Sequence, residues 1–170
     1  VYGLDTSRTQ NEVCGVISNP MELGEASKLD LYGVADYAWN IANYNPIDNW
    51  ERGLVELAPK AKDAYRTFAI HSSDTENGYR RDESWETKTF RMADWNDDEA
   101  RLLKAEFEKV EKVPAEMEKS CENKALLQEL RPWLIEFGKL GTRGKRAIEL
   151  AQIYRAGNND ADFWSKYIQN

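Results

Sequence analysis

The side chain best placed to bind a ligand is the carboxamide of Asn19, which stands between Ser18 and Pro20. The preceding residues, 13–17, form a short run rich in apolar and β-branched side chains, which predicts a buried strand. In β/α barrels and open α/β sheets, ligands bind where a strand ends and the next loop begins. An amide at that point offers donors and an acceptor, which suits a hydroxyl-rich ligand such as a sugar. The alternative is that Asn19 only caps the helix that follows.

A helix is expected after this segment, because Pro20 suits a first helical turn and apolar residues then recur at helical spacing as far as Ile41. The apolar face of this helix is broad, so the helix must pack against another element. A buried strand that leads into a packed helix is half of a β/α unit. The sequence therefore predicts that Asn19 lies at the ligand-binding end of such a unit.

Two other groups of polar residues have side chains that occur in active sites. The run from His71 to Asp74 contains the residue types of a hydrolytic triad, but triads are assembled from distant segments, so a helix end and a polar turn are the favoured interpretation. Asp97 and Asp98 are adjacent, but a capping pattern places them in the first turn of a helix, where the helix dipole favours acids. No residue of this chain is therefore predicted to be catalytic.

The sequence contains no pattern typical of a metal or nucleotide site. Its two cysteines, Cys14 and Cys121, are too few for a disulfide framework and are interpreted as buried or half-buried thiols. No metal-ligand spacing surrounds the single histidine, and no glycine-rich phosphate loop is present. No metal and no cofactor are therefore expected.

Three blocks of the sequence resemble a known family: SNPMELGEASKLDLYGVADYAWN, NYNPIDNWERGLVELAP and FAIHSSD. They are similar to the end of the catalytic barrel in family 84 glycoside hydrolases, the β-N-acetylglucosaminidases that include bacterial O-GlcNAcases. The resemblance continues through NGYRRDESW and covers at least residues 13 to 85. It implies that Asn19 hydrogen-bonds hydroxyl groups of a bound N-acetylglucosamine. With this resemblance, ligand binding becomes the preferred interpretation of Asn19 over helix capping.

The resemblance also implies a reaction. In the family, the acetamido group of the substrate attacks the anomeric carbon while paired aspartates orient it and supply acid and base catalysis, which differs from the usual two-carboxylate scheme. Those aspartates lie on an earlier strand and are not in this chain, so the chain alone is expected to be inactive. The implied partners are a glycan or glycoprotein that bears N-acetylglucosamine, and the remainder of the catalytic barrel. Similarity to bacterial members favours an extracellular or periplasmic location.

Trp85 is the second candidate for substrate binding. It follows a polar stretch that carries both signs of charge and contains Gly78. If that stretch faces the mouth of the active site, the indole can stack on an aglycone or a peptide. The alternative is that Trp85 only anchors the helix that follows it.

The expected fold is mainly α: the last strand and helices of a (β/α)8 barrel, followed by an antiparallel helical bundle. A barrel typically needs about 250 residues, so this chain of 170 is expected to be the C-terminal part of a longer enzyme. We place the boundary between the barrel portion, 1–85, and the bundle, 86–170, in the polar stretch before Trp85. The competing hypothesis is a non-catalytic helical module that binds a protein partner.

Within the bundle, an apolar stripe that includes Trp133 is expected to form the core. Replacing a core tryptophan with alanine would cost about 3–5 kcal/mol.

Charge narrows the range of partners. The chain has 30 acidic and 23 basic residues and a net charge of −7, which disfavours nucleic acids and anionic membranes because both bind basic surfaces. No apolar stretch approaches the roughly 20 residues that a membrane span requires. The composition suits a protein that handles a neutral ligand.

Overall fold

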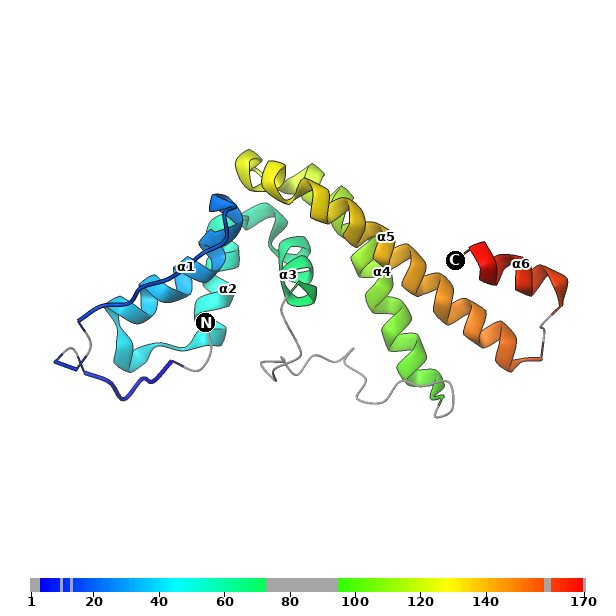
Figure 1. The fold of residues 1–170 in the computed structure, drawn as a ribbon, viewed down its shortest axis with the longest axis horizontal. Coiled ribbons are helices and arrows are strands. Elements are labelled where there is room, and N and C mark those ends of the chain that lie inside the picture. Colours follow the sequence, from blue (N-terminus) through cyan, green and yellow to red (C-terminus); the bar gives the residue numbers. More distant parts are fainter. Residues whose placement is uncertain (1–3, 10, 13, 73–94, 158–159, 170) are drawn as a thin grey trace.

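The computed structural model describes residues 4–9, 11–12, 14–72, 95–157 and 160–169. Within these ranges the chain forms six α-helices and two short 3-10 helices, arranged along an elongated molecule (Figure 1). The mainly α fold predicted from the sequence is confirmed. The elements are α1 (Gly24–Trp39), η1 (Ile41–Asn43), α2 (Pro46–Leu57), η2 (Pro59–Ala61), α3 (Lys62–His71), α4 (Asp97–Ser120), α5 (Lys124–Arg155) and α6 (Ala161–Gln169).

The strand predicted over residues 13–17 is not formed by residues 14–17 of the structure. These four residues have no regular secondary structure and are exposed to solvent, and Ile17 is 100% exposed. A strand needs a neighbouring strand for its backbone hydrogen bonds. No other described residue is in a strand that could supply them. Val13 lies outside the described residues.

Two helices begin at asparagine caps. The side chain of Asn45 caps α2 by accepting hydrogen bonds from the backbone N–H groups of Ile47 and Asp48, at 2.9 and 3.2 Å. Pro46 occupies the first turn of that helix. Asn96 caps α4 in the same way, through two N–H groups at 2.9 and 3.1 Å. In both cases a short polar side chain satisfies donors that the helix cannot satisfy itself.

Helices α4 and α5 form an antiparallel pair that runs along the molecule (Figure 1). Glycines on α5 allow the two helices to approach closely. A Cβ atom added to Gly141 would lie 2.3 Å from the backbone nitrogen of Glu111 and 2.7 Å from its Cα. One added to Gly138 would lie 2.9 Å from a ring carbon of Pro114. At Gly141 the backbones themselves are therefore in contact, and no larger residue fits.

The prolines and glycines inside these helices do not end them. Helix α4 continues through Pro114, and α5 continues through Pro132 and its three glycines to Arg155. Tertiary packing along the pair evidently outweighs the low helix propensity of these residues.

The assignment of Trp133 to the core is wrong, because its side chain is 60% exposed. The buried face of α5 contains Leu130, Leu134 and Phe137, which are 5%, 3% and 8% exposed. Adjacent residues on a helix point about 100° apart, so the position just before Leu134 lies at the edge of this face. Trp133→Ala is therefore expected to cost less than about 1 kcal/mol, as surface substitutions do.

One hydrophobic core joins helices from α1 to α5. Its least exposed members include Leu54 of α2, Val110 and Met117 of α4 and Leu126 of α5, each at most 1% exposed. The predicted boundary near residue 85 lies outside the described residues. The helices before this boundary and those after it share one core, so apolar burial holds them together.

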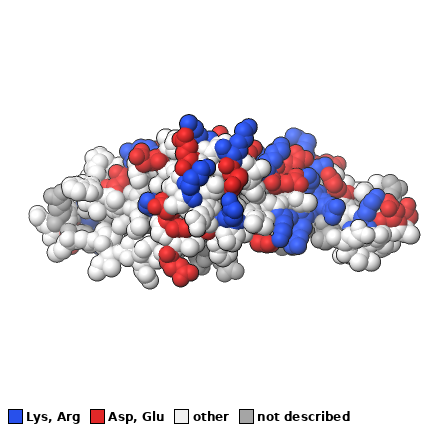
Figure 2. Space-filling model, turned by 90° about the horizontal axis from the view of Figure 1, so that it is seen from above, with Lys and Arg blue, Asp and Glu red and all other residues white. Residues whose placement is uncertain are grey.

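Charged side chains of both signs are mixed over the face of the molecule seen in Figure 2. Side chains of opposite charge pair between α4 and α5: Lys104 with Glu149 at 3.0 Å, Arg131 with Glu118 at 3.2 Å, and Lys145 with Glu111. Exposed pairs of this kind contribute little stability individually. Among the described helices, none has the length and apolar character needed to cross a bilayer.

We predict that Gly141→Ala destabilises the chain by about 1–3 kcal/mol, because the new methyl group would force α4 and α5 apart. This loss should appear even though alanine favours helix formation over glycine by about 1 kcal/mol. Urea unfolding followed by circular dichroism measures it. Gly15→Ala is the control, since nothing lies within 4 Å of the added Cβ. An equal effect of the two substitutions would contradict a packing constraint at Gly141.

Candidate functional site

Asn19 lies in an exposed segment that precedes α1 without belonging to it. Residues 14–20 are all exposed, and α1 begins only at Gly24. The N-cap position is occupied by Leu23, whose side chain makes no capping hydrogen bond. The alternative that Asn19 caps the helix is therefore wrong, as is the expectation that Pro20 lies in the first helical turn. The carboxamide of Asn19 therefore has no helix-capping role.

The start of α1 is held by a side chain from α5. The backbone N–H of Ala26 donates a hydrogen bond to Oε2 of Glu129 at 2.9 Å. This carboxylate takes the place of an N-cap, since it satisfies a helix donor and faces the positive end of the helix dipole. Ser27, which is only 2% exposed, places its hydroxyl 2.8 Å from the carbonyl oxygen of Leu23 and 3.1 Å from that of Met21. These bonds fix the chain immediately after the segment that carries Asn19.

A second polar link joins the first turns of α1 and α5. The Oδ1 atom of Asn123 accepts from the backbone N–H of Leu126 and so caps α5, at 3.0 Å. Its Nδ2 group donates to Oε2 of Glu25 on α1, also at 3.0 Å. Hydrogen bonds from Lys28, and then from Asn123, hold the pKa of the Glu25 carboxyl below its ordinary value. Glu25 therefore stays ionised at the N-terminus of α1, where negative charge is favourable.

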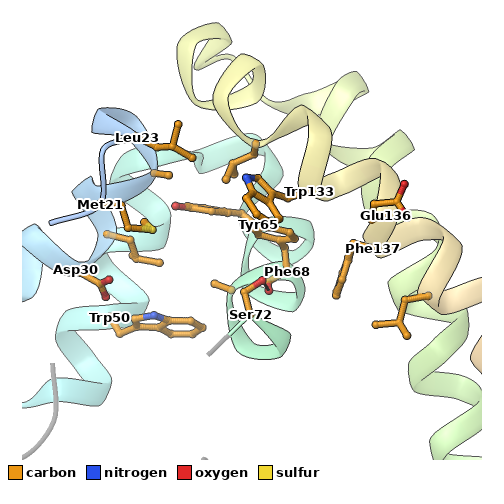
Figure 3. A pocket seen from close by; sticks show the side chains of 15 residues that line it. Met21, Leu23, Asp30, Trp50, Tyr65, Phe68, Ser72, Trp133, Glu136 and Phe137 are labelled. Atoms are coloured by element: carbon orange, nitrogen blue, oxygen red, sulfur yellow. Dashed lines mark hydrogen bonds between the residues drawn. The ribbon is translucent and has the colours of Figure 1, made fainter. Parts of the chain in front are cut away.

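Beside this junction lies an apolar groove of about 880 Å³, bounded by α1, α2, α3 and α5 (Figure 3). Met21 and Leu23 form one side, and Trp133 and Phe137 of α5 form the other. Tyr65 is also part of the lining. Met21 is the second residue after Asn19, so the groove begins close in sequence to the predicted sugar-binding residue. Its volume falls within the range of about 300–1,000 Å³ that is usual for ligand sites.

A smaller hollow of about 400 Å³ lies between α5 and α6. Its aromatic walls include Tyr154, Phe163, Trp164 and Tyr167. Phe163 is buried and contacts the other three rings, with centroids 5.0 to 6.2 Å away. These contacts hold α6 against the end of α5, and we assign the cluster a packing role.

His71 and Ser72 do not form a catalytic arrangement. The Nε2 atom of His71 lies 3.0 Å from Oε1 of Glu106, a residue of α4, and the Ser72 hydroxyl donates to the carbonyl oxygen of Phe68 at 2.8 Å. An ionised carboxylate can only accept, so Nε2 donates. Lys109 donates to the other oxygen of Glu106 at 2.7 Å. This cluster joins the end of α3 to α4.

Burial acts to raise the pKa of Glu106, whose side chain is 7% exposed. The hydrogen bonds from His71 and Lys109 outweigh burial, so the pKa of the carboxyl lies below its ordinary value. Glu106 is therefore ionised at neutral pH despite its burial. Such a group stabilises the fold only while its proton is absent.

The remaining sequence predictions have different outcomes. Trp85, Ser73 and Asp74 lie outside the described residues. Asp97 and Asp98 do occupy the first turn of α4, as predicted. The described residues contain no group of three or more histidine, cysteine or acidic side chains placed to hold a metal ion. Cys121 is buried, as expected, whereas Cys14 is exposed, because the strand that was to bury it is not formed.

Comparisons with known proteins support the family resemblance that the sequence blocks indicated. Residues 1–70 match the family profile of β-N-acetylglucosaminidase, and residues 83–169 match the hyaluronidase post-catalytic domain-like family. The fold is similar to the solved structure of CpGH84B, with 30% sequence identity, 94% of this chain covered and a TM-score of 0.78. It is also similar to the structure of CpGH84D, with 25% identity, 97% covered and a TM-score of 0.81. This chain spans 29% of the length of each of those proteins.

Glu129→Ala is expected to lower the free energy of unfolding by about 0.5–2 kcal/mol, the range for losing a helix cap. The reason is that the Ala26 N–H would lose its acceptor at the start of α1. Thermal unfolding measures the loss, and hydrogen exchange at the first turn of α1 should become faster. Gln128→Ala is the matched control, because Gln128 is next to Glu129 on α5 and its side chain is exposed. Equal melting temperatures for the two variants would remove Glu129 from this role.

Glu106→Gln is expected to destabilise the chain at pH 7 by about 1–3 kcal/mol, because a buried charge-assisted pair is replaced by weaker bonds. A lowered folded-state pKa stabilises above the unfolded pKa of about 4.3, and that contribution is lost as pH falls through the folded-state value. The difference between the variant and the wild type should therefore shrink below about pH 4. Urea unfolding at a series of pH values tests this. Glu118→Gln, at an exposed pair with Arg131, should change stability by less than about 0.5 kcal/mol.

Proposed function

Given that this chain belongs to the family 84 glycoside hydrolases, we propose that it is part of a retaining β-N-acetylglucosaminidase. The whole protein would hydrolyse terminal β-linked N-acetylglucosamine on a glycan or glycoprotein. In this proposal the chain supplies the end of the catalytic barrel and the post-catalytic helices. The catalytic aspartates belong to an earlier part of the enzyme.

The observation that carries the proposal is the match of residues 1–70 to the β-N-acetylglucosaminidase family, together with the state of Asn19 within them. Asn19 is exposed and is not the N-cap of α1, so its amide is available to a ligand. The chain just beyond it is fixed by the hydroxyl of Ser27 and by the carboxylate of Glu129. A binding group on a fixed segment costs less entropy when a sugar binds.

In the proposed reaction, the Asn19 amide hydrogen-bonds sugar hydroxyls and helps to orient the ring. The acetamido group of the substrate then attacks the anomeric carbon, and the aspartate pair of the barrel assists it with proton transfers. Trp85 is proposed to stack on the sugar or its aglycone near the mouth of the site. The contribution of this chain is positioning, which is worth a large part of a catalytic barrier when the reacting groups are held in alignment.

The second candidate is a non-catalytic helical module that binds a protein. The apolar groove beside Trp133 is the observation that favours it. The two candidates differ in whether a protein that contains this chain turns over a β-N-acetylglucosaminide. A hydrolysis assay on the whole protein therefore separates them, and residues 1–170 alone are expected to show no turnover.

In the whole protein, Asn19→Ala is expected to lower kcat/KM about 5-fold to 150-fold. Loss of hydrogen bonds to a desolvated polar ligand costs about 1–3 kcal/mol, which corresponds to this range. The melting temperature should be unchanged, because Asn19 does not cap α1. Hydrolysis of an aryl β-N-acetylglucosaminide and thermal unfolding are measured on the same preparation.

Asn11→Ala is the control for this experiment, since Asn11 is another exposed asparagine of the N-terminal stretch. It should leave both quantities unchanged. Normal kinetics for Asn19→Ala would take Asn19 out of the sugar site. A wild-type protein without turnover would contradict the proposed function itself.

A further inference from the structure

The groove between α1, α3 and α5 leaves large apolar side chains in water. Trp133 is 60% exposed, Met21 is 53% exposed and Leu140 is 51% exposed, and all three belong to its lining. Scattered exposed apolar residues are normal, but a contiguous hollow lined by them marks a binding surface. Figure 3 shows Trp133 above Tyr65, across the groove from Met21.

The groove is formed in advance of any binding event. Phe68 of α3 and Phe137 of α5 meet edge to face, with ring centroids 5.3 Å apart, and are 9% and 8% exposed. Because these rings belong to the core, they hold α3 and α5 at a fixed spacing. An occupant would therefore fill an existing shape, with little cost for rearranging the protein.

The charged residues that line the groove are acidic. Among the described residues that line it, two are acidic and none is basic. Asp30 lies on the α1 side and Glu136 on the α5 side (Figure 3). Glu136 already pairs with Lys139 at 2.7 Å, whereas Asp30 forms no ion pair or hydrogen bond with any described residue. A positively charged group in the groove would complement Asp30.

One buried polar group in the lining has no hydrogen-bond partner among the described residues. Tyr65 is 3% exposed, and no described residue hydrogen-bonds its hydroxyl group. Burial raises the pKa of this phenol, so the hydroxyl keeps its proton and remains a donor. A buried donor without an acceptor is costly, and each such group in a folded protein requires an explanation. An occupant that presents a carbonyl oxygen would supply the acceptor.

These features fit a polypeptide better than a glycan. A glycan carries hydroxyl groups along its whole length, and the mostly apolar lining would leave most of them unpaired. An apolar peptide segment buries its side chains against the aromatic walls and presents backbone carbonyls and, in a basic residue, a positive charge.

We propose that this groove is a docking site for an apolar segment of another protein, a segment that also carries a lysine or arginine. The apolar side chains pack against Trp133, Tyr65 and Met21, and the basic side chain pairs with Asp30. The recognition mode is the insertion of an amphipathic element into a hydrophobic groove. The site is independent of the reaction proposed for the whole protein, because it contains no residue assigned to sugar binding.

The test uses two synthetic helical peptides with leucines at positions i, i+3, i+4 and i+7. One carries a single lysine beside the leucine face and the other carries glutamate at the same position. Titration calorimetry with residues 1–170 and with the whole protein measures both affinities. The lysine peptide is expected to bind about tenfold more tightly or better, since like charges across an interface are unfavourable.

Variants locate the binding site. Trp133→Ala should weaken binding of the lysine peptide about tenfold or more, as loss of a central aromatic anchor does. Asp30→Asn should abolish the preference for lysine over glutamate. Trp39→Ala is the control, because this side chain is 87% exposed and is not part of the groove lining.

Four outcomes would overturn the proposal: no binding of either peptide, equal binding of both, wild-type affinity for Trp133→Ala, or binding to residues 1–170 but not to the whole protein. The last would mean that another part of the same protein covers the groove. Light scattering adds a further check: a dimer of the wild type that Trp133→Ala dissociates would identify a second copy as the occupant instead. Because the readout is binding, its failure would leave the proposed hydrolase activity unaffected.

Discussion

The contact between the backbones of α4 and α5 at Gly141 is the constraint on which the rest of the fold depends. Because no side chain separates the two helices there, their spacing is set by main-chain atoms of Glu111 and Phe107. Long helices fixed at so short a distance form a rigid support. The first three helices attach to it through the shared apolar core and through polar bonds at both ends of the contact region.

Those polar bonds have a common character. Glu129 holds the start of α1, and Glu106 holds the end of α3 through His71. In each case a carboxylate on the α4 and α5 pair binds a group from the N-terminal helices. Buried or half-buried charges are unfavourable unless every oxygen is satisfied, so such bonds select one arrangement of the helices over others that would bury a similar apolar area. The position of the segment that carries Asn19 follows from this arrangement of the helices, because that segment leads directly into α1.

The sequence predicts those features that arise from local chemistry. Caps such as Asn45 and Asn96 are accessible to sequence analysis, because a cap and the groups it binds are neighbours in the chain. The strand before Asn19 is not formed by residues 14–17, because an apolar run becomes a strand only when another strand pairs with it and no other described residue is in a strand. The cap of α1 cannot be predicted either, since Glu129 is 103 residues away from the N–H it binds. Trp133 fails for a related reason: helical spacing identifies an apolar stripe, but only the neighbouring helices decide where the stripe's buried part ends. The sugar-binding role of Asn19 came from resemblance to a family, that of Trp85 from its place after a polar stretch, and both remain predictions.

The double use of Asn123 has a consequence for the order of events during synthesis. Its amide caps α5 and also binds Glu25 of α1. This binding partner for α1 is therefore in place only once the first turn of α5 has formed. A ribosome adds about 5–20 residues per second, so the 98 residues between these partners correspond to a wait of about 5–20 s. During that wait the apolar side of α1 has no permanent partner from α5. A nascent chain of this protein would therefore be open to chaperones, or to aggregation, until α5 leaves the exit tunnel.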